Sequence, residues 1–148
     1  MRDDLSRPSR FRRFAGSVQA STAVEFALLA PVFLFLVMGM AGYGIYFGAS
    51  HSVQQIAADA ARSSVAGLTQ AERRAIVTAY VAANAGGYPF IDPRKLKVET
   101  HDSVADGSQF VVTATYDAGE LPIWHLMDRL VLPGSIIRRQ STIRVGGL

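Results

Sequence analysis

An uncharged segment from Phe26 to Ser50 constrains this chain more than any other feature. Its 25 residues form a helix about 37 Å long at about 1.5 Å per residue. The hydrocarbon core of a bilayer is about 30 Å thick, so one tilted helix of this length spans it. The segment therefore predicts a single-pass membrane protein with a transmembrane helix over residues 21–50.

Basic residues lie before this segment. Residues 1–24 contain five arginines and two aspartates, a net +3 that equals the formal charge of the whole chain. Arginines that precede an apolar span favour a cytoplasmic N-terminus, with the rest of the chain outside the inner membrane. We interpret residues 1–20 as a cytoplasmic basic leader. The other charges cancel, so no nucleic acid is expected as a partner, because its affinity depends largely on phosphate neutralisation.

Beyond Ser50 the helical pattern continues and becomes amphipathic, which predicts a stalk helix over residues 51–67. The apolar stripe of this helix is expected to comprise Val53, Ile56, Ala57, Ala60, Ala61 and Val65. Asp59 and Arg62, three residues apart on the opposite side, are expected to form a solvated ion pair. Gly67 is expected to end the helix.

Residues 68–148 have the pattern of a small α+β head. Thr69 and Glu72 have the spacing of a capping box, and a helix is expected from about residue 70 to 85, before Gly86 and Gly87. Alternating residues predict strands over 95–101 and 109–116, joined by a turn at Asp106-Gly107. The apolar stretch 121–132 is expected to form a short helix or a packed loop, and 136–145 a last strand. The overall fold class is α+β, with a long N-terminal helix before a head that has a second helix and a short antiparallel sheet.

The residues that carry chemistry are sparse and scattered. The chain has no cysteine, and His51, His101 and His125 have no metal-ligand spacing. Neither a phosphate-binding glycine loop nor a nucleophile motif is present. We therefore expect no enzyme activity, no metal and no cofactor.

Two features of the apolar segment point to contacts with other chains. Glu25 lies at its start, where a carboxylate is costly unless a cation offsets its desolvation. The candidate cation is the amine of a cleaved N-terminus or the same group on a neighbour; otherwise Glu25 stays among lipid headgroups. Gly44 and Gly48 form a GxxxG pair, which either lets another helix approach closely or reflects the high glycine content of membrane helices.

The segment Ala20-Ser21-Thr22-Ala23-Val24-Glu25-Phe26, followed by further apolar residues, resembles the start of TadE-like proteins. These are minor pilins, or pseudopilins, of the tight-adherence (Tad, or Flp) pilus. The resemblance implies that a prepilin peptidase cuts between Ala20 and Ser21, which makes Glu25 the fifth mature residue and Phe26 the sixth. Most members have glycine before the cut, where this chain has Ala20. Chain length favours the TadE or TadF type over the longer TadG type.

The resemblance implies a function in pilus assembly. The expected partners are membrane lipid, the prepilin peptidase, other pilin or pseudopilin subunits and the tight-adherence secretion machinery. The expected location is the bacterial inner membrane, with the head periplasmic or extracellular. The alternative is a signal-anchored envelope protein whose head binds a partner or ligand and has no role in pili. Cleavage of the leader distinguishes the two.

Overall fold

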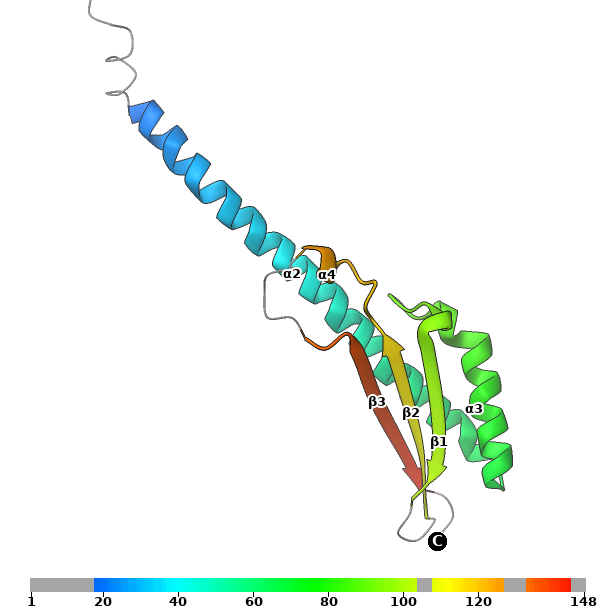
Figure 1. The fold of residues 1–148 in the computed structure, drawn as a ribbon. Coiled ribbons are helices and arrows are strands. Elements are labelled where there is room, and N and C mark those ends of the chain that lie inside the picture. Colours follow the sequence, from blue (N-terminus) through cyan, green and yellow to red (C-terminus); the bar gives the residue numbers. More distant parts are fainter. Residues whose placement is uncertain (1–17, 104–107, 127–132, 145–148) are drawn as a thin grey trace, which may run out of the picture. The chain divides into compact units, whose positions relative to one another are not determined.

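The computed structural model describes residues 18–103, 108–126 and 133–144. The chain forms two compact units, residues 1–40 and 41–148. Helix α2, Val18–Ser63, begins in the first unit and continues into the second (Figure 1). The helix was predicted to begin at Ser21, and it begins three residues earlier, since Val18, Gln19 and Ala20 are also helical. Pro31 lies inside the helix and does not end it, although proline removes one backbone hydrogen bond.

The amphipathic half of α2 packs on the head, as its periodicity predicts. Five of the six stripe residues are fully buried, namely Val53, Ile56, Ala57, Ala60 and Ala61. Val65 was predicted to be the sixth, and this is wrong: it is 65% exposed, and Ser64 is buried in its place. The chain tightens into the 3-10 turn η1 at Ser64–Ala66, and a turn of three residues instead of 3.6 shifts the buried position. Gly67 caps this turn.

Helix α3, Gln70–Asn84, starts with the predicted capping box. The Thr69 hydroxyl accepts from the Glu72 amide at 3.2 Å, and the Glu72 carboxylate accepts from the Thr69 amide at 3.1 Å. The backbone amides of Leu68 and then Thr69 donate hydrogen bonds to the Glu72 carboxylate and lower its pKa. Short 3-10 turns follow at Ala85–Gly87 and Pro93–Lys95.

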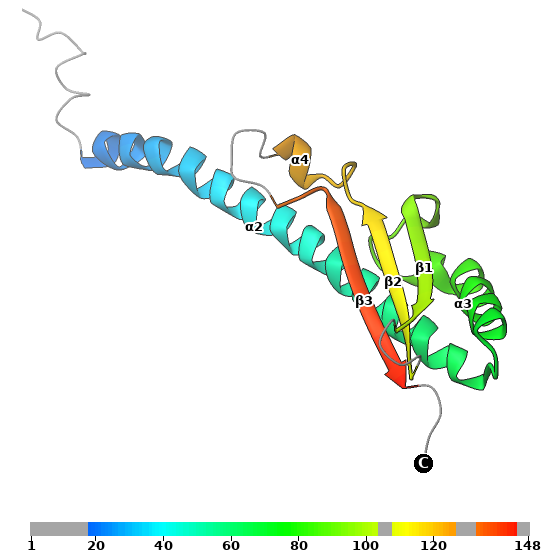
Figure 2. The same cartoon turned by 60° about the horizontal axis from the view of Figure 1, so that its bottom comes forward.

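The sheet has three antiparallel strands in the order β1-β2-β3, with β1 at Leu96–Asp102, β2 at Gln109–Asp117 and β3 at Ile136–Arg144. Helix α4, Ile123–Leu126, lies between β2 and β3 in the chain, so this part of the expected stretch 121–132 is a short helix, and residues 127–132 lie outside the described part. Helix α2 runs along one face of the sheet, and α3 lies beside β1 (Figures 1 and 2). The predicted Asp106-Gly107 turn and the last predicted strand residue, Val145, lie outside the described residues. The α+β fold is confirmed.

Small residues on α2 determine how closely the sheet approaches. One buried cluster joins Ala49, Val53 and Ala57 of α2 to Tyr116 and Ile137 of the sheet. A second joins α2 and α3 to the sheet, and contains Ala60, Ala61, Val77, Phe110 and Val112. Alanine side chains leave room for the larger residues of β2, and this complementarity provides the close packing that a small core needs.

Candidate membrane span and assembly site

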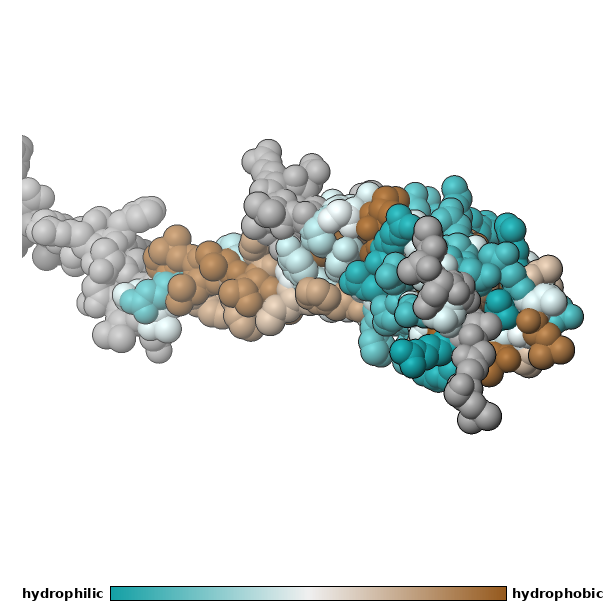
Figure 3. Space-filling model, turned by 90° about the horizontal axis from the view of Figure 1, so that it is seen from below, coloured by the Kyte–Doolittle hydropathy of each residue, from teal (hydrophilic) through white to brown (hydrophobic). Residues whose placement is uncertain are grey.

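The first half of α2 is an exposed apolar surface. Its large side chains between Val24 and Met40 are 38–72% exposed, with Phe26 at the upper limit. Figure 3 shows this stretch as a hydrophobic band on the helix. Among the described residues, α2 is the one helix long and apolar enough to cross a membrane, and little of its most apolar part is buried. Such a surface requires lipid or other apolar helices around it.

The predicted processing and assembly residues lie in the first turns of α2. Ala20 and Ser21 are helical. The Ser21 hydroxyl donates to the Glu25 carboxylate at 3.4 Å, one turn further along. Among the described residues, Glu25 forms no ion pair. A long hydrogen bond from a neutral hydroxyl offsets little of the cost of placing a carboxylate beside an apolar surface, so pairing with a cation and a position among lipid headgroups both stay predictions for Glu25.

The two glycines of the GxxxG pair have different surroundings. A Cβ at Gly48 would lie 2.7 Å from the Phe90 ring, whereas a Cβ at Gly44 would meet nothing within 4 Å. Gly48 therefore gives space to a residue of the head. Contact of Gly44 with another helix stays a prediction.

A row of polar groups joins α2 to β3 and to the residues just before it. Tyr46 donates to the Gly134 carbonyl at 3.2 Å, and Gln54 donates to the Gln140 carbonyl at 3.3 Å. Between them, Arg139 donates to the Ser50 hydroxyl at 2.6 Å. These contacts were not predicted from the sequence. The available signal was the spacing of 46, 50 and 54, since residues four apart lie on one side of a helix.

The predicted Asp59–Arg62 ion pair is confirmed, with a distance of 3.0 Å. Asp59 has a second role that the sequence did not indicate, because it also accepts a hydrogen bond from the Tyr88 hydroxyl at 2.9 Å. Tyr88 and Tyr80 share a further hydrogen bond of 2.9 Å. Burial, followed by these hydrogen bonds, raises the pKa of Tyr88. The network ties α2 to α3 and to the loop after it.

Arg73 is a buried cation that sequence reasoning did not single out. Its guanidinium lies 5.2 Å from the centre of the Phe110 ring and 3.5 Å from the Asp102 carboxylate. It also donates to the carbonyls of Gly67 and Leu68. A Cβ at Gly67 would lie 2.7 Å from the Arg73 backbone, so this glycine permits a close approach as well as ending η1. These contacts fix the turn between α2 and α3.

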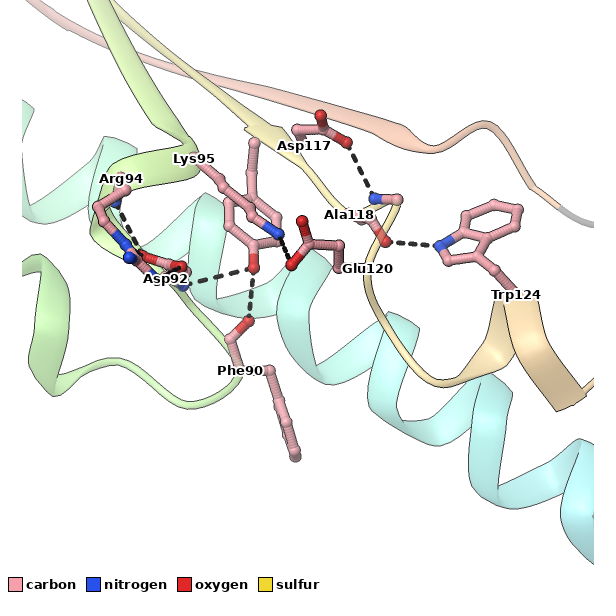
Figure 4. Close-up of polar contacts among 10 residues, drawn as sticks. Phe90, Asp92, Arg94, Lys95, Asp117, Ala118, Glu120 and Trp124 are labelled. Carbon is pink, nitrogen blue, oxygen red and sulfur yellow. Dashed lines mark hydrogen bonds and ion pairs between the residues drawn. The ribbon is translucent and has the colours of Figure 1, made fainter.

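The opposite end of the head, around α4 and the start of β1, carries paired charges (Figure 4). Arg94 donates to the Asp92 carboxylate through its side chain, at 2.8 and 3.1 Å, and through its backbone amide. These hydrogen bonds lower the pKa of Asp92 to about 2. Lys95 pairs with Glu120, and this contact raises the pKa of Lys95. The Trp124 indole N–H donates to the Ala118 carbonyl at 2.5 Å.

No group of three or more potential metal ligands occurs among the described residues. His51 and His101 are exposed, and the side chain of His125 lies outside the described part. A groove of about 700 Å³ runs beside α3 and is lined by Gln70, Ala71, Arg74, Ala75, Thr78, Ala79 and Thr100. The Thr78 hydroxyl in this groove donates to the Arg74 carbonyl at 2.9 Å, a contact within the helix.

Comparison with known proteins identifies the N-terminal part of the chain. The sequence model described as "TadE-like protein" matches residues 20–62, which run from the expected cleavage site to the last turn of α2. No curated protein and no solved structure matches the chain. Over residues 20–62, which form most of α2, the chain is similar to the TadE-like protein family.

Proposed function

We propose that this chain is a membrane-anchored minor pilin, or pseudopilin, that takes part in the assembly of a tight-adherence pilus. The observation that carries the proposal is the TadE-like match, which falls on the helix that exposes its apolar first half and packs its second half on the head. TadE-like proteins are a pilin-like structural family and are not known as enzymes. The proposed activity is accordingly one of association rather than catalysis.

Each part of the chain has a proposed role. The basic leader, residues 1–20, stays in the cytoplasm until a prepilin peptidase removes it between Ala20 and Ser21. The apolar helix holds the subunit in the bilayer, and Glu25 pairs with the N-terminal amine of a pilin chain. The head lies outside the membrane, where it contacts other pilin subunits and the secretion machinery.

The proposed end of the lipid-exposed span is nearer residue 41 than residue 50. A Cβ at Gly42 would lie 3.3 Å from Ile123, and Ala49 and Ser50 are buried in the head. Residues 21–41 rise about 31 Å at about 1.5 Å per residue, close to the roughly 30 Å of a hydrocarbon core. The stretch beyond residue 41 then belongs to the head unit.

The alternative function is a signal-anchored envelope protein with a partner-binding head. The open groove beside α3, of about 700 Å³, is the observation that favours it, because its exposed side chains provide a surface against which a peptide segment can pack. In this alternative the apolar helix serves only as an anchor.

Deletion and complementation in the native host test the two functions. A deletion strain should lose pili in electron micrographs and lose surface adherence, and the wild-type gene should restore both. A variant with the groove filled, Ala75→Tyr, should also restore both if the chain acts as a pilin. Normal pili in the deletion strain, with the protein present in wild-type membranes, would refute the pilin role and favour the alternative.

A further inference from the structure

Aromatic side chains gather on α2 where its lipid-exposed stretch is proposed to end. Phe47 lies 6.0 Å from Tyr46 and 6.2 Å from Tyr43, measured between ring centres. Phe47 nevertheless stays 64% exposed. An exposed phenylalanine beside two tyrosines is typical of the boundary between apolar and aqueous surroundings, where amphipathic rings are enriched.

The loop before β1 adds an aromatic ring at the same level. Phe90 has a φ of 62°, in the left-handed region that a bulky residue rarely adopts. Its carbonyl accepts a hydrogen bond from the Tyr116 hydroxyl at 3.1 Å, and its ring lies on the backbone of α2 at Gly48. The residue is still 50% exposed. Figure 4 shows the ring pointing away from the polar contacts around Asp92. A strained backbone that presents an apolar ring to the outside indicates a function for that ring.

Helix α4 brings a third aromatic group to this level. Ile123 is fully buried against Gly42 of α2, and this contact anchors the helix. The next residue, Trp124, is partly exposed and has its one N–H group satisfied within the head by the Ala118 carbonyl. The exposed part of the indole is therefore apolar carbon, which water solvates poorly and lipid solvates well.

We propose that Tyr43, Phe47, Phe90 and Trp124 form an aromatic contact with the interfacial layer of the bilayer, so that this end of the head rests in the membrane surface. The inference rests on the proposed membrane anchorage. The α2 contacts of this group span residues 42–48, a rise of about 9 Å. A headgroup layer is roughly 5–8 Å thick on each side of the hydrocarbon core, so the group matches it in depth.

Lipid suits this surface better than a charged partner does. Among the described residues nearby, Arg94 pairs with Asp92 and Lys95 with Glu120, and the Asp117 carboxylate accepts a hydrogen bond from the Gly119 amide. Neutralised pairs attract an anionic surface weakly. We therefore expect contact through the aromatic rings, independent of anionic lipid and of salt concentration.

The single tryptophan of the chain provides the test. The full chain would be placed in phosphatidylcholine nanodiscs, one copy per disc, with nitroxide groups on lipids at a shallow or a mid-bilayer depth. Trp124 emission should be blue-shifted and should be lost most strongly with the shallow nitroxide. Added anionic lipid or salt should change neither result.

Two variants in a Trp124→Phe background serve as a matched pair, each checked for folding by circular dichroism. Phe47→Trp should be quenched by the shallow nitroxide. Leu68→Trp is the control, since Leu68 is 89% exposed and follows the end of α2. Ser63, the last helical residue, is already ~22 Å along the axis from Gly48. The control should be quenched by aqueous iodide and not by lipid nitroxides.

The outcomes separate the inference from the anchorage on which it rests. If the chain floats with liposomes but Trp124 and Phe47→Trp both behave like Leu68→Trp, the interfacial contact is wrong and the anchorage stands. A blue shift without nitroxide quenching, seen only when several copies share a disc, would assign the aromatic surface to a second copy instead. If the chain does not float with liposomes at all, both proposals fail.

Discussion

At the scale of single residues, Asp92 makes a specific pH dependence testable. Its pKa is lowered to about 2 from an ordinary 3.8, mainly by hydrogen bonds from Arg94. Because the folded pKa is the lower one, the carboxylate stabilises the head above pH 3.8, and this contribution is lost as the pH falls through about 2. The difference in melting temperature between the wild type and Asp92→Asn should therefore be constant at neutral pH and shrink between these two values.

Thermal unfolding of the detergent-solubilised chain, followed by circular dichroism across this pH range, measures the difference. Glu99→Gln is the control, because Glu99 is an exposed carboxylate on β1 and forms no ion pair among the described residues. A difference between wild type and Asp92→Asn that persists unchanged below pH 2 would show that Asp92 acts through packing and not through its charge.

At the scale of elements, the capping box of α3 predicts a defined loss of stability. Thr69→Ala removes the hydroxyl that accepts from the Glu72 amide. Loss of such an N-cap costs about 1 kcal/mol. Thr78→Ala is the matched control, because Thr78 lies within the helix and its hydroxyl only returns to the Arg74 carbonyl. Denaturant unfolding should show a lower midpoint for Thr69→Ala and little change for Thr78→Ala. Equal midpoints would mean that tertiary contacts, and not the cap, hold the start of α3.

Elements were predictable where a local rule determines them. The capping box, the stop at Gly67 and the strands depend on residues close together in the chain, and all three occur in the structure. The predicted alternation in burial holds for β1, whereas β2 is buried continuously from Phe110 to Ala114 because it is the central strand. Val65 was misplaced because tightening of the last turn changes the helical period, which a fixed spacing does not anticipate. Arg73 and the contact between Arg139 and Ser50 depend on how α2, α3 and the sheet meet. A single sequence contains little information about such long-range contacts.

At the scale of the whole molecule, the contacts of α2 predict which fragment folds independently. A fragment that starts at Ala41 keeps the hydrogen bond of Tyr46, the Gly48–Phe90 contact and buried Ala49 and Ser50. A fragment that starts at His51 loses all four. The lost hydrogen bonds are those of Tyr46 with Gly134 and of Ser50 with Arg139, and the lost methyl group is that of Ala49. Together they contribute on the order of 3 kcal/mol to the free energy of unfolding. That difference lowers the melting temperature by roughly 10 °C or more in a domain of this size.

Circular dichroism of the two fragments, 41–148 and 51–148, tests this prediction. Both should contain helix and strand, and the longer should unfold cooperatively at the higher temperature. Equal melting temperatures would show that residues 41–50 contribute nothing to the head. A disordered longer fragment would show that the head depends on neighbouring subunits or on the membrane.

We propose that the N-terminal helix acts in pilus assembly through Glu25, and the variant Glu25→Gln is a direct test of this role. The change preserves shape and removes the charge that is proposed to pair with the amine of a pilin chain. In the native host, leader cleavage and membrane insertion would be measured beside pilus number and adherence. We expect normal insertion with a marked loss of pili. Normal piliation and adherence in Glu25→Gln cells, with normal cleavage of the leader, would contradict it.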